Sequence, residues 1–185
     1  MRPLSITPWD ATWVPTVSAF WGDHEVTRPD AAEFVAAVMS ALASVDSTLL
    51  GWRAPGKSLQ QALANPEIGP LPAEIEPLLE VDQPEFGYDF FVWNGRDDDD
   101  LAGFNITVGL HAENRHLVNR VVVNLPTTWT DNDPRIIHLR DVLVDVVQPE
   151  TVALFSGQPL TRTDLWTRAG SVNDTTWRGV RRPAP

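Results

Sequence analysis

The fold is decided by residues 86–125, which contain three alternating runs: Phe86-Gly87-Tyr88-Asp89-Phe90-Phe91-Val92-Trp93-Asn94, then Phe104-Asn105-Ile106-Thr107-Val108-Gly109-Leu110, then Leu117-Val118-Asn119-Arg120-Val121-Val122-Val123-Asn124-Leu125. In each run, large apolar residues share every second position. This period of two is typical of antiparallel strands with one buried face. Because the connections between the runs are short, the sequence predicts a three-stranded meander.

Two long helices flank this meander in the sequence. Apolar residues recur at helical spacing from about 29 to 47, with Pro29 in the first turn, and again after Asp133-Pro134. Further strands are predicted at 16–22 and 151–156, and short helices at 58–65 and 74–79. The predicted fold class is α+β: a single antiparallel, mostly meander sheet of about five strands, with two long helices on one face.

The composition predicts one globular domain followed by a tail. The chain has 185 residues, of which 43% are hydrophobic, and no cysteine, so it can bury a core but forms no disulfide or thiolate metal site. We expect a single domain over 1–156, with an extended lead-in at 1–15. Residues 157–185 are predicted to be a basic tail that ends in proline, and the sequence leaves open whether this tail is ordered. Within it, residues 161–185 hold five basic and two acidic residues, a net charge of 5 − 2 = +3.

Negative charge is concentrated in one segment. Residues 67–100 hold eleven acids and one base, Arg96, a balance of 1 − 11 = −10 in a chain whose net charge is −11. Such a surface disfavours direct binding to nucleic acid, which needs cationic side chains, and to an anionic membrane. It favours a basic protein partner, although many acidic proteins carry this charge for solubility alone.

The first alternating run lies inside this acidic segment and supplies the candidate binding residues. The alternation places Phe91 and Trp93 with Asp89 on the sheet face that the helices are not expected to cover. Two large aromatic side chains on a polar face either pack under a loop or form a binding patch, and the covered arrangement is the more common one on monomers. The predicted partner-binding residues are Glu85, Asp89, Phe91, Trp93, Asp97, Asp98, Asp99 and Asp100.

Motifs for catalysis or cofactor binding are weak. His111, Glu113 and His116 flank a predicted hairpin turn, but their spacing matches no established zinc signature. The aspartates of 97–100 lack the alternating ligands, central glycine and closing glutamate of an EF-hand. Residues 51–58 fit the spacing of a phosphate-binding loop, but the loop contains bulky residues and no long helix is predicted after it. We therefore predict no catalytic residue, no metal and no cofactor.

A further set of features follows in order along residues 16–156. It comprises a strand Val17-Ser18-Ala19-Phe20-Trp21-Gly22, an alanine-rich helix ending in Leu49-Leu50-Gly51-Trp52-Arg53, the aromatic run at 86–95, strands at 104–109 and 119–126, and a helix leading to Thr151-Val152-Ala153-Leu154. In this order and spacing the chain resembles the bacterial polymorphic-toxin immunity proteins of the immunity protein 52 type, although residues 157–185 match less well. The resemblance implies a cytoplasmic, non-enzymatic inhibitor that binds a cognate toxin, often a nuclease of the restriction-endonuclease type. It brings no catalytic or metal residue.

The charge distribution and the resemblance lead to the same expectation. A nuclease needs a basic surface to hold phosphates, and an acidic inhibitor can occupy that surface. Two other functions stay open. One is an adaptor module of a secretion apparatus, which would not protect against a neighbouring toxin. The other is an enzyme for a small cationic or sugar-like substrate, which would need a deep pocket with perturbed carboxylates.

The predicted location is the cytoplasm. The first residues lack the apolar run of a secretion signal, and no stretch of about 18 apolar residues occurs in the sequence. We therefore expect no membrane contact.

Overall fold

The structure, a computed structural model, describes residues 14–22, 24–81, 87–96, 100–109, 119–130 and 133–157. The elements follow the order β1 (Val14–Trp21), α1 (Arg28–Val45), η1 (Ser47–Leu49), α2 (Leu59–Ala64), α3 (Pro72–Ile75), η2 (Glu76–Leu78), β2 (Tyr88–Trp93), β3 (Gly103–Val108), β4 (Asn119–Asn124), α4 (Pro134–Val147) and β5 (Thr151–Gly157). The labels η1 and η2 denote short 3-10 helices. The predicted α+β class is confirmed. Most of the predicted lead-in and tail lies outside the described residues.

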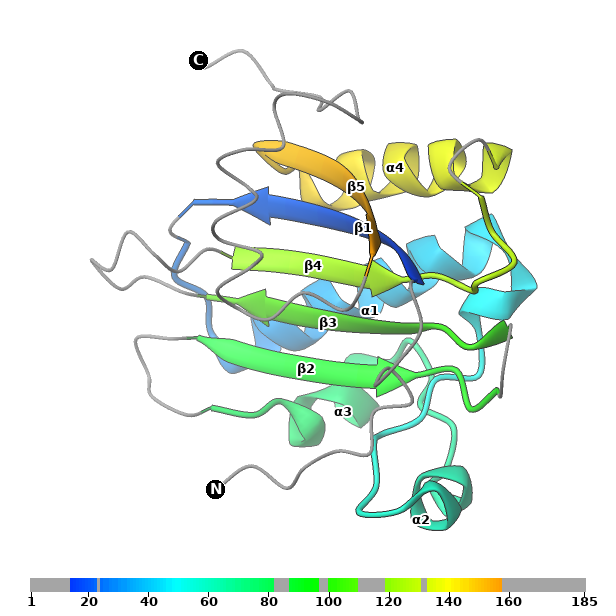
Figure 1. Ribbon diagram of the computed structural model, residues 1–185. Helices are drawn as coiled ribbons and strands as arrows, with labels where there is room; N and C mark the ends of the chain where they lie inside the picture. The colour runs from blue at the N-terminus through cyan, green and yellow to red at the C-terminus, as the bar shows by residue number, and fades with distance from the viewer. Residues whose placement is uncertain are drawn as a thin grey trace.

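The five strands form one open antiparallel sheet in the order β2-β3-β4-β1-β5 (Figure 1). The predicted meander is present as β2-β3-β4. The first strand in sequence, β1, lies between β4 and β5 and pairs with both. This order leaves β2, the aromatic run, as the outermost strand on one side.

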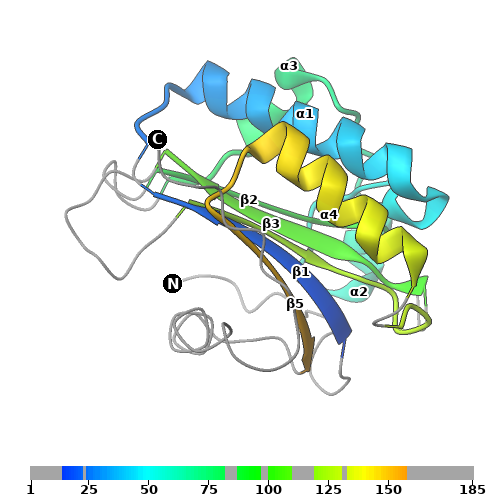
Figure 2. The ribbon, with the colours of Figure 1, turned by 90° about the horizontal axis from the view of Figure 1, so that it is seen from above.

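The pairing register gives the sheet two different faces. One row of partners across all five strands is entirely apolar and belongs to the main core: Phe90, Ile106, Val121, Ala19 and Val152. The next row points to the opposite face and is mixed: Phe91, Asn105, Val122, Ser18 and Ala153. Figure 2 shows α1 and α4 together on one face, as predicted.

Local signals in the sequence fix the starts of both long helices. Thr27 caps α1 in a reciprocal capping box with Asp30, and Asp133 caps α4 by accepting a hydrogen bond from the backbone N–H of Arg135. Each helix buries one apolar stripe, and full burial of each large side chain stabilises the fold by about 1.5–3 kcal/mol. Even the 18-residue α1, like every other helix in the described ranges, is too short or too polar to cross a membrane.

Candidate functional site

The outer edge of β2 is closed at both ends by short backbone bridges. At its start, Glu80 and Asp89 exchange two hydrogen bonds of 2.9 Å. At its end, Arg53 and Trp93 exchange hydrogen bonds of 2.7 and 3.1 Å. Because backbone groups alternate in direction along a strand, Phe91 directs its N–H and C=O away from β3 as well. Among the described residues these two groups have no partner, so the acidic aromatic run is an edge strand with one open position.

The three candidate residues on β2 differ in exposure. Asp89 is half-buried, and its Oδ1 accepts a 2.6 Å hydrogen bond from the hydroxyl of Thr107 on β3. Phe91 is half-buried too, whereas Trp93 is only 4% exposed. Trp93 lies opposite Gly103, which leaves room for the indole ring. The structure therefore supports the covered alternative for Trp93, which does not offer the exposed ring that a binding anchor needs.

The predicted acidic residues around β2 are only partly described. Glu85, Asp97, Asp98 and Asp99 lie outside the described residues, and their role stays a prediction. Asp100 is described and exposed.

Two acids that the sequence reasoning did not select lie along the same edge. The backbone bridges bring Glu80 beside Asp89 and Glu67 beside Arg53. Both Glu80 and Glu67 are exposed. Carboxylates from three parts of the chain therefore surround the edge of β2.

Asn94 fixes both ends of the loop between β2 and β3. Its side-chain amide donates to the carbonyl of Thr48 at 2.9 Å and to the carbonyl of Asp100 at 2.7 Å. Its Oδ1 accepts from the backbone N–H groups of Arg96 at 3.3 Å and Ala102 at 3.1 Å. All of the side chain's donors and acceptors are used, and the residue is 4% exposed. The loop that carries the four aspartates is therefore tied to the protein on both sides.

The turn that follows requires a glycine. Gly95 has φ +67°, in the left-handed region that costs other residues about 1–2 kcal/mol. A Cβ here would lie 2.8 Å from the Nε of Arg53. Arg53 itself is held by the carbonyl of Asn65 and by an ion pair of 2.9 Å with Glu67. The Asn94-Gly95 pair thus sets both the direction and the attachment of the acidic loop.

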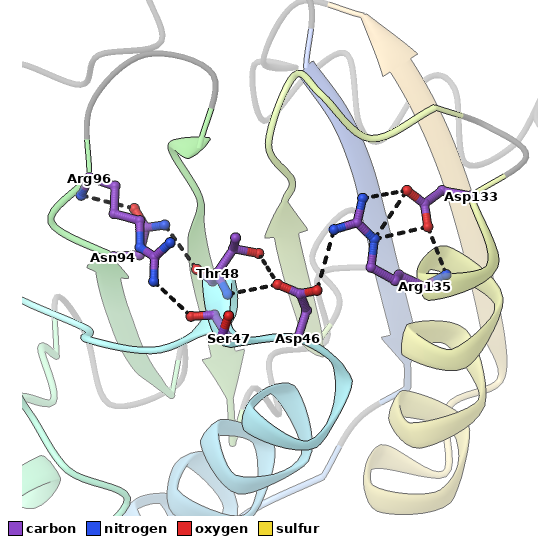
Figure 3. A network of polar contacts seen from close by, with 7 residues as sticks. All are labelled: Asp46, Ser47, Thr48, Asn94, Arg96, Asp133 and Arg135. Carbon is purple, nitrogen blue, oxygen red and sulfur yellow. Dashed lines mark hydrogen bonds and ion pairs between the residues drawn. The ribbon is translucent and has the colours of Figure 1, made fainter.

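A chain of polar contacts connects this loop to α4 (Figure 3). The guanidinium of Arg96 donates to the carbonyl of Ser47 at 2.9 Å. In the same turn, Asp46 accepts hydrogen bonds of 2.8 Å from the backbone and the hydroxyl of Thr48. Asp46 then pairs with Arg135 at the start of α4, at 3.3 Å. The turn after α1 therefore holds both the acidic loop and the second long helix.

The carboxylates around Arg135 are stabilised in their charged form. The hydrogen bond from Arg135 is the main reason why the pKa of Asp133 lies below its ordinary value, and it outweighs the opposing effect of burial. Burial alone would raise the pKa of Asp46, but the hydrogen bonds from Thr48 and Arg135 outweigh it, so this pKa is lowered as well. The guanidinium of Arg135 also lies over the ring of Trp129, 4.1 Å from its centre. Asp46, Asp133 and Arg135 together hold the start of α4 against the turn after α1, and we refer to these three residues as the clamp.

The remaining motifs have structural roles in the described part of the chain. Ser58, in the sequence that resembles a phosphate-binding loop, caps α2 by accepting a 3.2 Å hydrogen bond from the N–H of Gln61. The prediction that no long helix follows is confirmed, because α2 has six residues. Within the described ranges no group of three His, Cys, Asp or Glu residues could hold a metal ion. His111 and His116 lie outside these ranges.

No protein-family model matches the chain, and no curated protein matches it.

Proposed function

We propose that this protein is a non-enzymatic immunity protein that binds and neutralises a cognate toxin of nuclease type. The proposed binding surface is the edge of β2 together with the loop that follows it. It comprises the described acids Glu67, Glu80, Asp89 and Asp100, the half-buried Phe91, and the neighbouring Glu85, Asp97, Asp98 and Asp99. The observation that carries the proposal is the attachment of this acidic loop through the four hydrogen bonds of Asn94.

Attachment of the loop supports a binding role for energetic reasons. Four adjacent aspartates repel one another, and a free loop would spread them apart. Fixing both ends limits the conformational entropy that the loop loses when a partner binds. Arg53 offsets the charge of Glu67 through their ion pair, and Arg96, the one base among residues 67–100, donates to the carbonyl of Ser47. Because this segment holds eleven acids and one base, the surface keeps a net negative charge.

This negative charge suggests how neutralisation works. A nuclease holds its substrate with a basic surface, and an acidic protein surface can occupy the same side chains. Opposite potentials also speed the encounter of the two proteins. One molecule of this protein would inhibit one toxin molecule, because the bound protein would exclude nucleic acid from the basic surface of the toxin. The location that we propose is the cytoplasm, where a nuclease that attacks the cell meets its substrate.

Co-expression tests the proposal. The chain would be expressed in bacteria with the toxin encoded by the neighbouring gene, growth would be scored, and the two proteins would be co-purified at low and high salt. We expect restored growth and a one-to-one complex that weakens as salt rises. If growth were not restored and no complex formed, the immunity function would be refuted and the adaptor or enzyme alternatives would be favoured.

A further inference from the structure

A short segment beside β2 exposes three large apolar side chains. In the segment 71–81, Leu71 is 55% exposed, Leu78 38% and Val81 41%. α3 and η2 follow one another without a break, so this part of the segment spans about 12 Å. Three exposed apolar side chains within eleven residues exceed the scattered single ones that are normal on a protein surface, and concentrations of this kind mark interaction sites more often than single residues do.

The segment is held firmly in place. Ile75 and Leu79 are buried in the core, 0% and 4% exposed. The guanidinium of Arg28, at the start of α1, donates to the carbonyls of Glu76 at 2.8 Å and Leu79 at 3.2 Å. The exposed side chains therefore project from a fixed backbone, and little ordering is needed before a partner can bind them.

Its position and charge connect the segment to the proposed binding surface. The bridge between Glu80 and Asp89 joins its end directly to the edge of β2. In both ribbon views α3 lies on the side of α1 that is remote from α4 (Figures 1 and 2). The segment contains Glu74, Glu76 and Glu80 and no basic residue. Apolar side chains among carboxylates fit a partner whose apolar side chains lie among lysines and arginines.

We infer that Leu71, Leu78 and Val81 are the apolar anchors that hold the basic toxin, in place of the buried Trp93. The inference rests on the proposed function and adds the residues that supply affinity. The acids set the rate of encounter, and the three anchors slow dissociation once their surface is buried. A second copy of this chain is a less suitable occupant, because its own carboxylates would face the same charges.

The test uses the full chain and an inactive variant of the toxin encoded by the neighbouring gene. One triple variant carries Leu71→Gln, Leu78→Gln and Val81→Thr. The matched control is a single substitution on α4, Ile137→Gln, whose side chain is 50% exposed, and it is compared with the single variant Leu71→Gln, whose side chain is 55% exposed. Kd and dissociation rate would be measured by surface plasmon resonance, and folding by circular dichroism. If the triple variant does not fold, Leu71→Gln alone is measured.

We expect the anchor variant to raise Kd at least about tenfold through faster dissociation, and the control to change it less than about threefold. An unchanged Kd for the anchor variant, or an equal loss in the control, would overturn the inference and leave the immunity function standing. A wild-type chain that dimerises, with the anchor variant monomeric, would assign the surface to a second copy and also overturn it. If the wild-type chain neither binds nor protects, both proposals fail.

Discussion

The side-chain amide of Asn94 donates a 2.9 Å hydrogen bond to the carbonyl of Thr48, a residue that precedes it by 46 positions. This bond joins the end of the edge strand to the turn after α1. The same turn contains Asp46, which pairs with Arg135 of α4. The turn after α1 therefore anchors the loop of aspartates to both long helices.

Replacing Asn94 with alanine should destabilise the protein. The substitution removes four hydrogen bonds and leaves backbone groups without partners, so we expect the free energy of unfolding to fall by about 2–3 kcal/mol in urea denaturation. Asn105→Ala is the matched control, because the half-buried Asn105 makes one long hydrogen bond of 3.5 Å to Phe90. We expect this control substitution to lower the free energy of unfolding by less than about 1 kcal/mol. Equal losses in the two variants would contradict a special role for Asn94.

The dependence of stability on pH should report the clamp around Arg135. Asp46 and Asp133 have pKa values below 3.8 in the folded protein, so they bind protons less readily than in the unfolded chain. The stability they contribute is therefore complete above about pH 5 and is lost as pH falls through 3.8 toward the folded values. In Arg135→Gln, the free energy of unfolding should fall less steeply between about pH 5 and pH 2.

The effect should be modest, because the side chain of Arg135 is 36% exposed and salt screens its charge. Arg140→Gln is the control, since within the described part of the chain the exposed Asp141 pairs with Arg140 alone. Urea denaturation at a series of pH values from about 2 to 6 would give the free energy of unfolding of each variant as a function of pH. If this free energy changed equally steeply with pH in both variants, the clamp would not stabilise the charged forms of Asp46 and Asp133.

Amide hydrogen exchange should reveal the open position of the edge strand. All three residues lie opposite partners on β3, but only Phe90 and Val92 direct their N–H groups toward that strand. The N–H of Phe91 points outward, like those of Asp89 and Trp93 that bond to Glu80 and Arg53, and it has no partner among the described residues. We expect the Phe91 amide to exchange at least about tenfold faster than its two neighbours. Equal protection along the strand would mean that the edge is covered.

The alternating residues and helix-starting signals predicted the elements of this fold. Tyr88 to Asn124 show the period of two that the three strands require, and Asp133-Pro134 marks the start of α4. The order of the strands was not predictable in the same way. Periodicity tells which residues share a face and not which strands are neighbours, so the position of β1 between β4 and β5 is a property of the tertiary structure.

The candidate site was predicted less completely than the fold. The Asn94-Gly95 pair is a recognised turn signal, and it could have identified the attachment of the loop. The partners of Asn94 and the exposure of Leu71 depend on contacts between distant residues, which local pattern does not contain. Trp93 follows the strand alternation, but its burial depends on what packs against that face of the sheet.

The most direct test of the central claim is the association rate between the chain and the inactive toxin, measured by stopped-flow at several ionic strengths. We expect the wild-type rate to fall at least about tenfold from 50 to 500 mM salt. A variant with all four aspartates of the loop neutralised should bind the toxin more slowly at low salt, and its association rate should depend less on salt. Its substitutions are Asp97→Asn, Asp98→Asn, Asp99→Asn and Asp100→Asn. A control with four exposed acids neutralised elsewhere should behave like the wild type: Glu25→Gln, Glu33→Gln, Asp141→Asn and Asp145→Asn. A complex that forms at the same rate at every salt concentration and keeps its Kd without the four aspartates would contradict the acidic interface.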